Sequence, residues 1–355
     1  MPDDMSSATT STTTSTRGAL HKRLRYLIIQ ACEVDDVDLI SQALTLGSVE
    51  QVTKLALPRV FSQNAPKVLE YLLTHGSDVK VIADIAATHI ALAAYESAFP
   101  KSLVQILLNH GWDINHRHHD QPLLWQIVYD GDAVAWCLER GASILPKGQK
   151  LWPEFNINNA EAFAEYFERF PYSSKERSDC LYYCSPILEL AAQQSTVKTF
   201  ELLRSKGAPL GWRVLHMAAT GRACFAVPEH SVTKQANPID EWERQLSDRE
   251  LARTREERMN MVRHLVDNLK LDVNARDQPP GWILGNFFGR PLHYVAHKGG
   301  LKGDCREVTL FLLQKGADPE LVIPMALGKS NFLDAVKEWK LMQTSDAVQS
   351  SAGEN

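Results

Sequence analysis

One stretch, residues 290–319, constrains the fold of this chain more than any other part of the sequence. It opens with Arg290-Pro291-Leu292-His293, continues with apolar residues at the spacing of two short amphipathic helices, and closes with Gly316-Ala317-Asp318-Pro319. Gly316 falls where the second helix should end, at a position that favours a positive φ angle. Because one such helix pair cannot bury its apolar face alone, neighbouring pairs of the same kind are expected.

The closing pattern of this stretch recurs along the chain. Apolar residues followed by a helix-ending glycine are found at Gly47, Gly76, Gly111, Gly141, Gly207 and Gly316, and a lengthened ending without a glycine covers Leu265–Asn274. Where neighbouring endings are uninterrupted, they lie roughly 30 to 35 residues apart. The helix openings are more degraded, with good matches at Gln121-Pro122-Leu123, Ser185-Pro186-Ile187 and Val214-Leu215-His216.

In these residues the chain resembles the ankyrin repeat family, with Arg290–Pro319 as the best match. The family's repeat opens with Thr-Pro-Leu-His and closes with Leu-Leu-x-x-Gly-Ala-Asp; here Arg290 replaces the Thr, and residues 301–304 are inserted between the helices. The first three units lack the opening motif and depend on the closing motif and the period. The resemblance implies an all-α, ankyrin-type α-solenoid of about eight helix-turn-helix units with a long insertion and a C-terminal capping helix.

The expected domain organisation has three segments. They are a disordered Ser/Thr-rich N-terminus over residues 1–19, a repeat domain over 20–343, and a disordered C-terminal tail over 344–355. Insertions interrupt the repeat domain near 145–184, 222–258 and 278–289.

Three helices outside the regular pattern are predicted. Residues 158–170 form an amphipathic helix that belongs to a degenerate unit. From the cap at Asn237 to Leu269 nothing in the sequence breaks a helix, so one long second helix is predicted there, with a mixed-charge run that is typical of a solvated surface. The capping helix is predicted over residues 331–342, where charged residues supply some of a polar outer face.

The charge and the cysteines limit the classes of function. The 355 residues carry a formal net charge of -5, so no global basic field indicates a nucleic-acid partner. No apolar run approaches the roughly 20 residues that a membrane span needs, so no membrane is expected. The six cysteines are mostly far apart and follow no signal peptide, which indicates free thiols and an intracellular protein, cytoplasmic or nuclear.

The function favoured by the resemblance is a protein-binding scaffold or adaptor, because ankyrin proteins generally bind ligands with finger tips and the inner, first-helix face. The sequence has no Walker A, GxGxxG, GxSxG or HExxH motif, so enzymatic activity is left uncertain, and no cofactor or metal is expected. Two alternatives stay open. One is a small-molecule site or atypical enzyme in the concave groove near the last two full repeats, and the other is a structural adaptor that associates with itself.

Eight residues in or beside the last two full repeats are the candidate ligand- or partner-binding set. They are Trp212, Arg213, His216, Trp282, Phe287, Phe288, Arg290 and His293. They would enclose a groove only if both late insertions fold over the concave face, whereas a scaffold would leave that face open. Aromatic residues in predicted fingers fit either a binding hot spot or local packing of an insertion.

The remaining candidate functional residues are histidines. His216 and His293 stand at the family's His position, where the resemblance implies structural hydrogen bonds to the neighbouring finger. His293 and His297 share one helical face, but Tyr294 stands where a zincin has its Glu. The segment His116–Asp120 carries three His and one Asp, which fits a solvated loop, and a zinc site or a pH-responsive contact stays an alternative.

Overall fold

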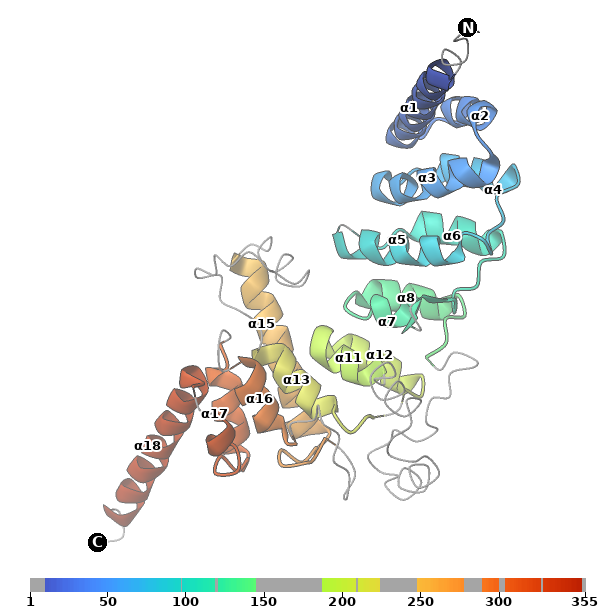
Figure 1. Cartoon of the computed structure of the whole chain (residues 1–355). Coiled ribbons are helices and arrows are strands. Elements are labelled where there is room, and N and C mark those ends of the chain that lie inside the picture. The colour runs from blue at the N-terminus through green and yellow to red at the C-terminus, as the bar shows by residue number, and fades with distance from the viewer. Residues whose placement is uncertain are drawn as a thin grey trace, which may run out of the picture. The chain divides into compact units, whose positions relative to one another are not determined.

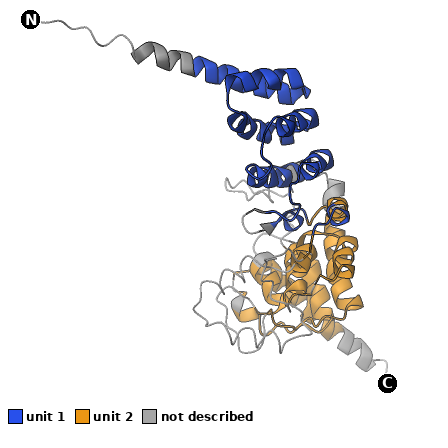
Figure 2. Ribbon diagram, turned by 90° about the vertical axis from the view of Figure 1, so that its right-hand side faces the viewer, with its two compact units in different colours: residues 1–127, 137–142 blue, residues 128–136, 143–355 orange. Residues whose placement is uncertain are grey.

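The structure is a computed structural model of the chain. It describes residues 10–96, 98–118, 121–144, 187–208, 210–223, 248–277, 289–299, 304–326 and 328–352. The predicted helix 158–170 and most residues of the three insertions lie outside these ranges. The chain divides into two compact units, with residues 1–127 and 137–142 in the first unit and residues 128–136 and 143–355 in the second (Figure 2).

The first unit is a stack of helix pairs. Its elements are α1 (Thr10–Val34), α2 (Val37–Leu46), α3 (Val49–Gln63), α4 (Pro66–Thr74), α5 (Ala83–Glu96), α6 (Lys101–Asn109), β1 (Arg117–His118), β2 (Gln121–Pro122) and α7 (Leu123–Gln126). The next helix, α8 (Gly131–Glu139), contributes residues to both units. First helices α1, α3, α5 and α7 pack in succession, as do second helices α2, α4 and α6 (Figure 1).

The second unit repeats this arrangement. Its elements are α11 (Ile187–Gln194), α12 (Val197–Ser205), α13 (Val214–Ala223), α15 (Asp248–Arg263), the π-helix η1 (His264–Asn268), α16 (Pro291–Gly299), α17 (Arg306–Gln314), the 3-10 helix η2 (Ile323–Met325) and α18 (Ser330–Ala352). First helices α11, α13 and α16 pack in succession. The alanine pairs Ala191-Ala192 and Ala218-Ala219 are buried, which lets these helices approach closely.

The regular secondary structure among the described residues is therefore helical except for the short β1–β2 ladder, which pairs Arg117 with Pro122 and His118 with Gln121. The expected all-α class is confirmed in this form, and the stacking of helix pairs is compatible with an α-solenoid. Among the residues described, no helix combines the length and the apolar character that crossing a membrane requires.

Most second helices end in one recurring way. Gly76, Gly111, Gly141, Gly207 and Gly316 all have φ between 86° and 105°. In each case the amide of the following residue bonds to a carbonyl five residues earlier, as in Ala317 N to Leu312 O at 2.9 Å. This closure is the Schellman motif, which satisfies carbonyls that a helix end leaves unpaired. Gly47 also ends its helix, but with extended backbone at φ -148°.

The lengthened ending at Leu265–Asn274 also satisfies helix-end carbonyls, with one additional residue in the turn. The turn of π-helix η1 absorbs that residue, as π-bulges do. Lys270 takes the left-handed conformation at φ 56°, and Leu271 N bonds to Leu265 O at 3.0 Å, six residues back. Within the described residues, the predicted long helix runs from Asp248 through Asn268 without a break, and residues 237–247 lie outside them.

Both ends of the chain are more helical than the sequence suggested. Helix α1 begins at Thr10, inside the segment expected to be disordered, and α18 continues to Ala352, beyond the predicted capping helix and into the expected tail. Neither extension contains a proline, and glycine is limited to Gly18. Each helix can therefore propagate outward from its packed turns, because every further residue adds a hydrogen bond. Residues 1–9 and 353–355 lie outside the described residues.

Candidate functional site

The candidate site is a buried polar cluster at the base of the finger that precedes α16. The finger-base cluster consists of Glu189 on α11, Arg213 and His216 at the start of α13, Asp277 and Gly289 at the two ends of the inserted segment 278–288, and Tyr294 on α16. Glu189 and Asp277 are nearly fully buried, at 1% and 2% exposure, and His216 has no exposed surface. Three consecutive units of the stack thus meet in one polar core.

Asp277 and Gly289 close the base of the inserted segment. The Asp277 amide donates to the Gly289 carbonyl at 2.7 Å, and the Gly289 amide donates back to Oδ2 of the Asp277 carboxylate at 3.0 Å. The Tyr294 hydroxyl donates to the same Oδ2 at 2.9 Å. Burial raises the pKa of Asp277, and these two donors act against that rise. The chain therefore leaves and re-enters the stack at a fixed point.

His216 joins this closure to α13. Its Nε2 lies 3.1 Å from both the Ala275 and the Gly289 carbonyl oxygens, so it must be the protonated nitrogen that donates to them. The ring also meets Tyr294 edge to face, with 5.1 Å between ring centroids. Burial lowers the pKa of His216 to about 3, so the side chain is neutral at physiological pH.

Arg213 is fixed by Glu189 on the preceding unit. Both its amide, at 2.9 Å, and its Nε, at 3.0 Å, donate to the Glu189 carboxylate. Burial alone would lower the pKa of Arg213, but Glu189, Tyr294 and Asp277 together raise it. Gly211 is required here, because a Cβ at that position would collide with the Glu189 carboxylate. At this helix start, the ion pair between Arg213 and Glu189 thus takes the place of the opening motif of the repeat.

Arg290 and His293 lie on the other side of the same finger. Arg290 donates through Nη1 to Asn274 Oδ1 at 3.3 Å, and its amide donates to His293 Nδ1 at 3.4 Å. Burial lowers the pKa of His293, and the backbone of Leu321 in the next finger acts against that shift. His293 therefore accepts a hydrogen bond at the start of its own helix, and its pKa responds to the following finger.

The two histidines differ in one respect. His293 Nδ1 accepts from the amide three residues before it, whereas the corresponding amide at Arg213 donates to Glu189. As a result, His216 Nδ1 is buried without a hydrogen-bond partner among the described residues. Oδ1 of Asp277 is in the same state. Burying a polar atom without a hydrogen bond costs free energy, so these two atoms reduce the stability of the cluster.

Five of the eight candidate residues can be placed, and the structure brings them together. Arg213 and His216 are in the finger-base cluster, Trp212 is their half-buried neighbour in the chain, and Arg290 and His293 border the cluster at the start of α16. Trp282, Phe287 and Phe288 lie outside the described residues. Because His216 is wholly buried, its role in any binding site is to hold the finger rather than to touch a ligand.

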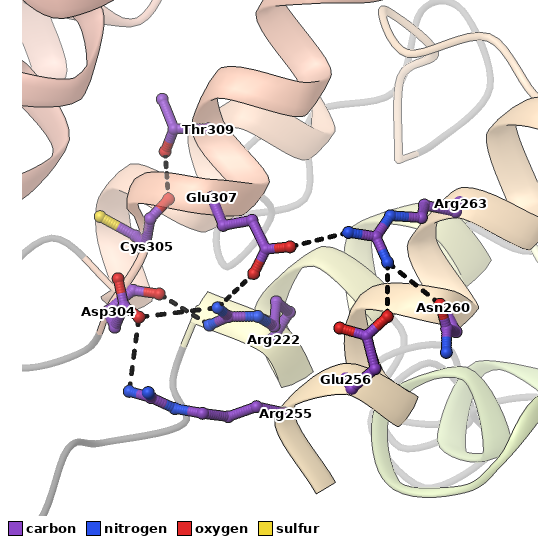
Figure 3. Close-up of polar contacts among 9 residues, drawn as sticks. All are labelled: Arg222, Arg255, Glu256, Asn260, Arg263, Asp304, Cys305, Glu307 and Thr309. Atoms are coloured by element: carbon purple, nitrogen blue, oxygen red, sulfur yellow. Dashed lines mark hydrogen bonds and ion pairs between the residues drawn. The ribbon is translucent and has the colours of Figure 1, made fainter. Parts of the chain in front are cut away.

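A second polar network ties the helices beside two other insertions. We call it the arginine clasp: Arg222 on α13, Arg255, Glu256 and Arg263 on α15, and Asp304 and Glu307 at the start of α17 (Figure 3). Arg222 is 2% exposed and donates to the Asp304 carbonyl at 2.8 Å and to Glu307 at 2.7 Å. The three arginines of the clasp balance the charge of its three carboxylates.

Within the clasp, Arg263 extends the network along α15. Its Nη2 donates to the other Glu307 oxygen at 2.8 Å, and its Nη1 donates to Glu256 at 2.8 Å and to Asn260 at 3.0 Å (Figure 3). Arg255 forms an ion pair with Asp304 at 3.4 Å. This helix is therefore more than the solvated surface that the sequence predicts, because Arg255 pairs with Asp304 just before α17 and Arg263 pairs with Glu307 on α17.

Sequence reasoning did not identify Glu189, Asp277 or Arg222. Each is an ordinary charged residue in sequence, and its partner lies 12 to 85 residues away. One signal was available: Glu189 stands inside the apolar run Ile187-Leu188-Glu189-Leu190-Ala191-Ala192, where a charge is buried only with a partner. No comparable signal marks Asp277 or Arg222.

The histidine-rich finger is only partly described. His116 Nε2 lies 2.8 Å from Asp84 Oδ1 on α5, while His119 and Asp120 lie outside the described residues. Among the described residues, no three or more His, Cys, Asp or Glu side chains are grouped as metal ligands. Among the described cysteines, Cys32 and Cys305 are buried free thiols, and Cys137 is also buried.

The comparisons with known proteins add no assignment. No protein-family model matches this chain, and no curated protein matches it.

Proposed function

We propose that this chain is an ankyrin-type repeat scaffold that binds another protein through its finger loops and the face formed by its first helices. Apolar side chains exposed at one position of two fingers carry this proposal. Val81 and Leu321 each stand five residues after the helix-ending glycine, and they are 52% and 47% exposed. The residues that follow them, Ile82 and Val322, are buried.

The turn beneath these tips is the same in four fingers. The side chains of Asp78, Asp113, Asp272 and Asp318 each accept from the amide two residues later, at 2.8 to 2.9 Å. Such Asx turns fix the backbone of the finger locally. A loop that is ordered before binding loses less conformational entropy when it docks, which favours recognition.

Neighbouring fingers are also bonded to one another. The side-chain amide of Asn115 donates to the Gly141 carbonyl at 3.1 Å, and that of Asn274 donates to the Gly316 carbonyl at 2.8 Å. At the position of Val81 and Leu321, the two other fingers with this turn carry His116 and Ala275. A constant base with different tip residues is the arrangement expected of binding loops on a rigid scaffold.

The experiment compares proteins that the full chain retains from extract of its own cells. The wild type, Val81→Ser, Leu321→Ser and the double variant are immobilised and the retained proteins quantified by mass spectrometry. Leu341→Ser on α18 is the matched control, because Leu341 is also exposed but lies outside the fingers. A specific partner should lose about tenfold in retention with each finger variant, corresponding to roughly 1.4 kcal/mol, and should keep its retention with the control.

A thermal-shift screen of metabolites on the same proteins distinguishes the groove alternative. A saturable shift by a small molecule, together with no protein whose retention depends on the fingers, would overturn the scaffold proposal. Within the described residues, both acids of the finger-base cluster make structural contacts, which favours the scaffold over an enzyme. Glu189 is held by Arg213, and Asp277 by Gly289 and Tyr294.

A further inference from the structure

The exposed side of α1 carries a dense group of cations. His21, Lys22, Arg23 and Arg25 are all exposed, and Tyr26 follows them directly. Tyr26 lies one helical turn from Lys22 and Arg23, so these side chains are neighbours on the helix surface. We call Lys22, Arg23, Arg25 and Tyr26 the α1 basic face.

The opposite side of α1 is already used for packing. Leu24, Leu27, Ile28 and Ala31 are buried, and the helix packs against α2 and α3. The α1 basic face is therefore held on a docked helix, not on a free one. Helices α1, α2 and α3 all belong to the first unit, so this packing is a property of that unit alone.

No ion pair or hydrogen bond engages the cations of this face among the residues that the structure describes. The other terminal helix, α18, gives a direct contrast within the same chain. There Asp334 pairs with Lys337 at 3.1 Å, Lys340 pairs with Glu320 at 2.7 Å, and Glu338 pairs with Arg306. Helix α18 thus shows that the polar outer face of a terminal helix can be built from charges of both signs. The single sign of charge on the α1 basic face requires another explanation.

Apolar surface accompanies the charge. Tyr26 and Val34 are 62% and 64% exposed, and Leu20 is also exposed on the same helix. Tyrosine and arginine are enriched where proteins bind each other, because both offer large contact areas and directional polar groups. An exposed aromatic ring among unpaired cations therefore indicates an interface more than a solubility device.

We propose that the α1 basic face binds an acidic segment of another protein, a surface separate from the fingers of the proposed function. Carboxylates of the segment pair with Lys22, Arg23 and Arg25, and an apolar side chain of the segment covers Tyr26. Charge complementarity of this kind fixes the partner and accelerates its association.

An acidic protein segment fits this face better than a bilayer or a nucleic acid. An interfacial membrane helix inserts its apolar side, and that side of α1 is buried in the stack. A long polyanion would meet the rest of a chain whose formal net charge is -5, whereas a short acidic segment meets only the local cations.

Fluorescence anisotropy tests the proposal on the full-length chain. The probe is a short fluorescein-labelled peptide of glutamates with leucines at helical spacing, titrated at low and at physiological salt. Saturable binding that weakens with salt is expected. The combined variant Lys22→Glu, Arg23→Glu, Arg25→Glu should weaken binding by at least about tenfold, and Tyr26→Ser, which keeps the charge, by about threefold.

The control reverses three exposed cations elsewhere, with Lys101→Glu, Lys198→Glu and Lys206→Glu in one chain. It has the same net charge as the α1 variant, and circular dichroism checks that both are folded. Equal loss of binding in the control, or no saturable binding by the wild type, overturns the proposal. Binding of a DNA duplex or of phosphatidylserine vesicles without the peptide also overturns it. A mass that rises with concentration and depends on Lys22, Arg23 and Arg25 would assign the face to a second copy instead.

Discussion

Asp277 and Gly289 hold each other across the ends of an inserted finger: the Asp277 amide donates to the Gly289 carbonyl at 2.7 Å, and the Gly289 amide donates to the Asp277 carboxylate at 3.0 Å. The segment between them is eleven residues long in sequence, 278–288. One residue at each end thus fixes where this segment joins the stack. The buried His216 donates to the same Gly289 carbonyl. The stability of the second unit therefore depends on long-range polar contacts of this kind.

Asp277→Ala should destabilise the chain by about 2–3 kcal/mol, because it leaves the Gly289 amide and the Tyr294 hydroxyl without their acceptor. Tyr294→Phe removes only one of these donors and should cost about 1 kcal/mol. Urea unfolding followed by circular dichroism measures both changes. If the two variants lose the same free energy of unfolding, Asp277 does not stabilise the protein by closing the base of the finger.

His216 predicts a pH dependence of stability with a definite sign. Its folded pKa of about 3 lies below the ordinary value of 6.5, so the unfolded chain binds more protons between these pH values. The stability that His216 contributes is present above pH 6.5 and is lost as pH falls towards about 3. The slope from this one group reaches at most about 1.4 kcal/mol per pH unit.

The measurement compares unfolding free energies of the wild type and His216→Gln at several pH values. The difference between the two proteins isolates His216 from other titrating groups. Asp277 acts in the opposite direction: burial raises its pKa, so its contribution decreases as pH rises from the ordinary carboxyl range near about 4. A difference that does not change between pH 4 and 7 would contradict the neutral, buried state of His216.

The arginine clasp predicts a coupling between Arg222 and Glu307, which are separated by 85 residues in sequence (Figure 3). A double-mutant cycle with Arg222→Met and Glu307→Gln should give a coupling free energy of about 1–3 kcal/mol, because Arg222 is buried. The exposed pair Asp334–Lys337 on α18 is the matched control and should give at most about 0.5 kcal/mol. Equal values for the two cycles would contradict the clasp.

Gly221 and Gly18 should respond oppositely to alanine, although both are in helices. A Cβ on Gly221 would collide with the backbone carbonyl of Gln193 on the neighbouring α11, so Gly221→Ala should cost about 2 kcal/mol or more. A Cβ on Gly18 meets nothing within 4 Å, so Gly18→Ala should stabilise α1 by about 0.5–1 kcal/mol. Thermal unfolding of the two variants measures the difference, and a tolerated Gly221→Ala would mean that α11 and α13 are not so closely packed.

Local sequence determined the repeating elements of this protein. Gly76, Gly111, Gly141, Gly207 and Gly316 are recognisable in the sequence, because a helix end with positive φ depends only on a few adjacent residues. The lengthened ending at Lys270 is also visible there, but its solution by a π-turn and a left-handed lysine is not. Helices α1 and α18 extend into segments for which the sequence suggests disorder, because polar composition by itself indicates disorder, whereas a packed helix can extend beyond its contacts.

The candidate site is only partly predictable from the sequence. Sequence identifies Arg213, His216, Arg290 and His293 as neighbours, because the repeat period places equivalent positions beside one another. Only the tertiary structure pairs Glu189 with Arg213, Asp277 with Gly289, and Arg222 with Glu307. Periodicity predicts which apolar faces are buried, since every unit buries the same positions. The partners of a buried charge are fixed by where distant segments meet, and no local pattern contains that information.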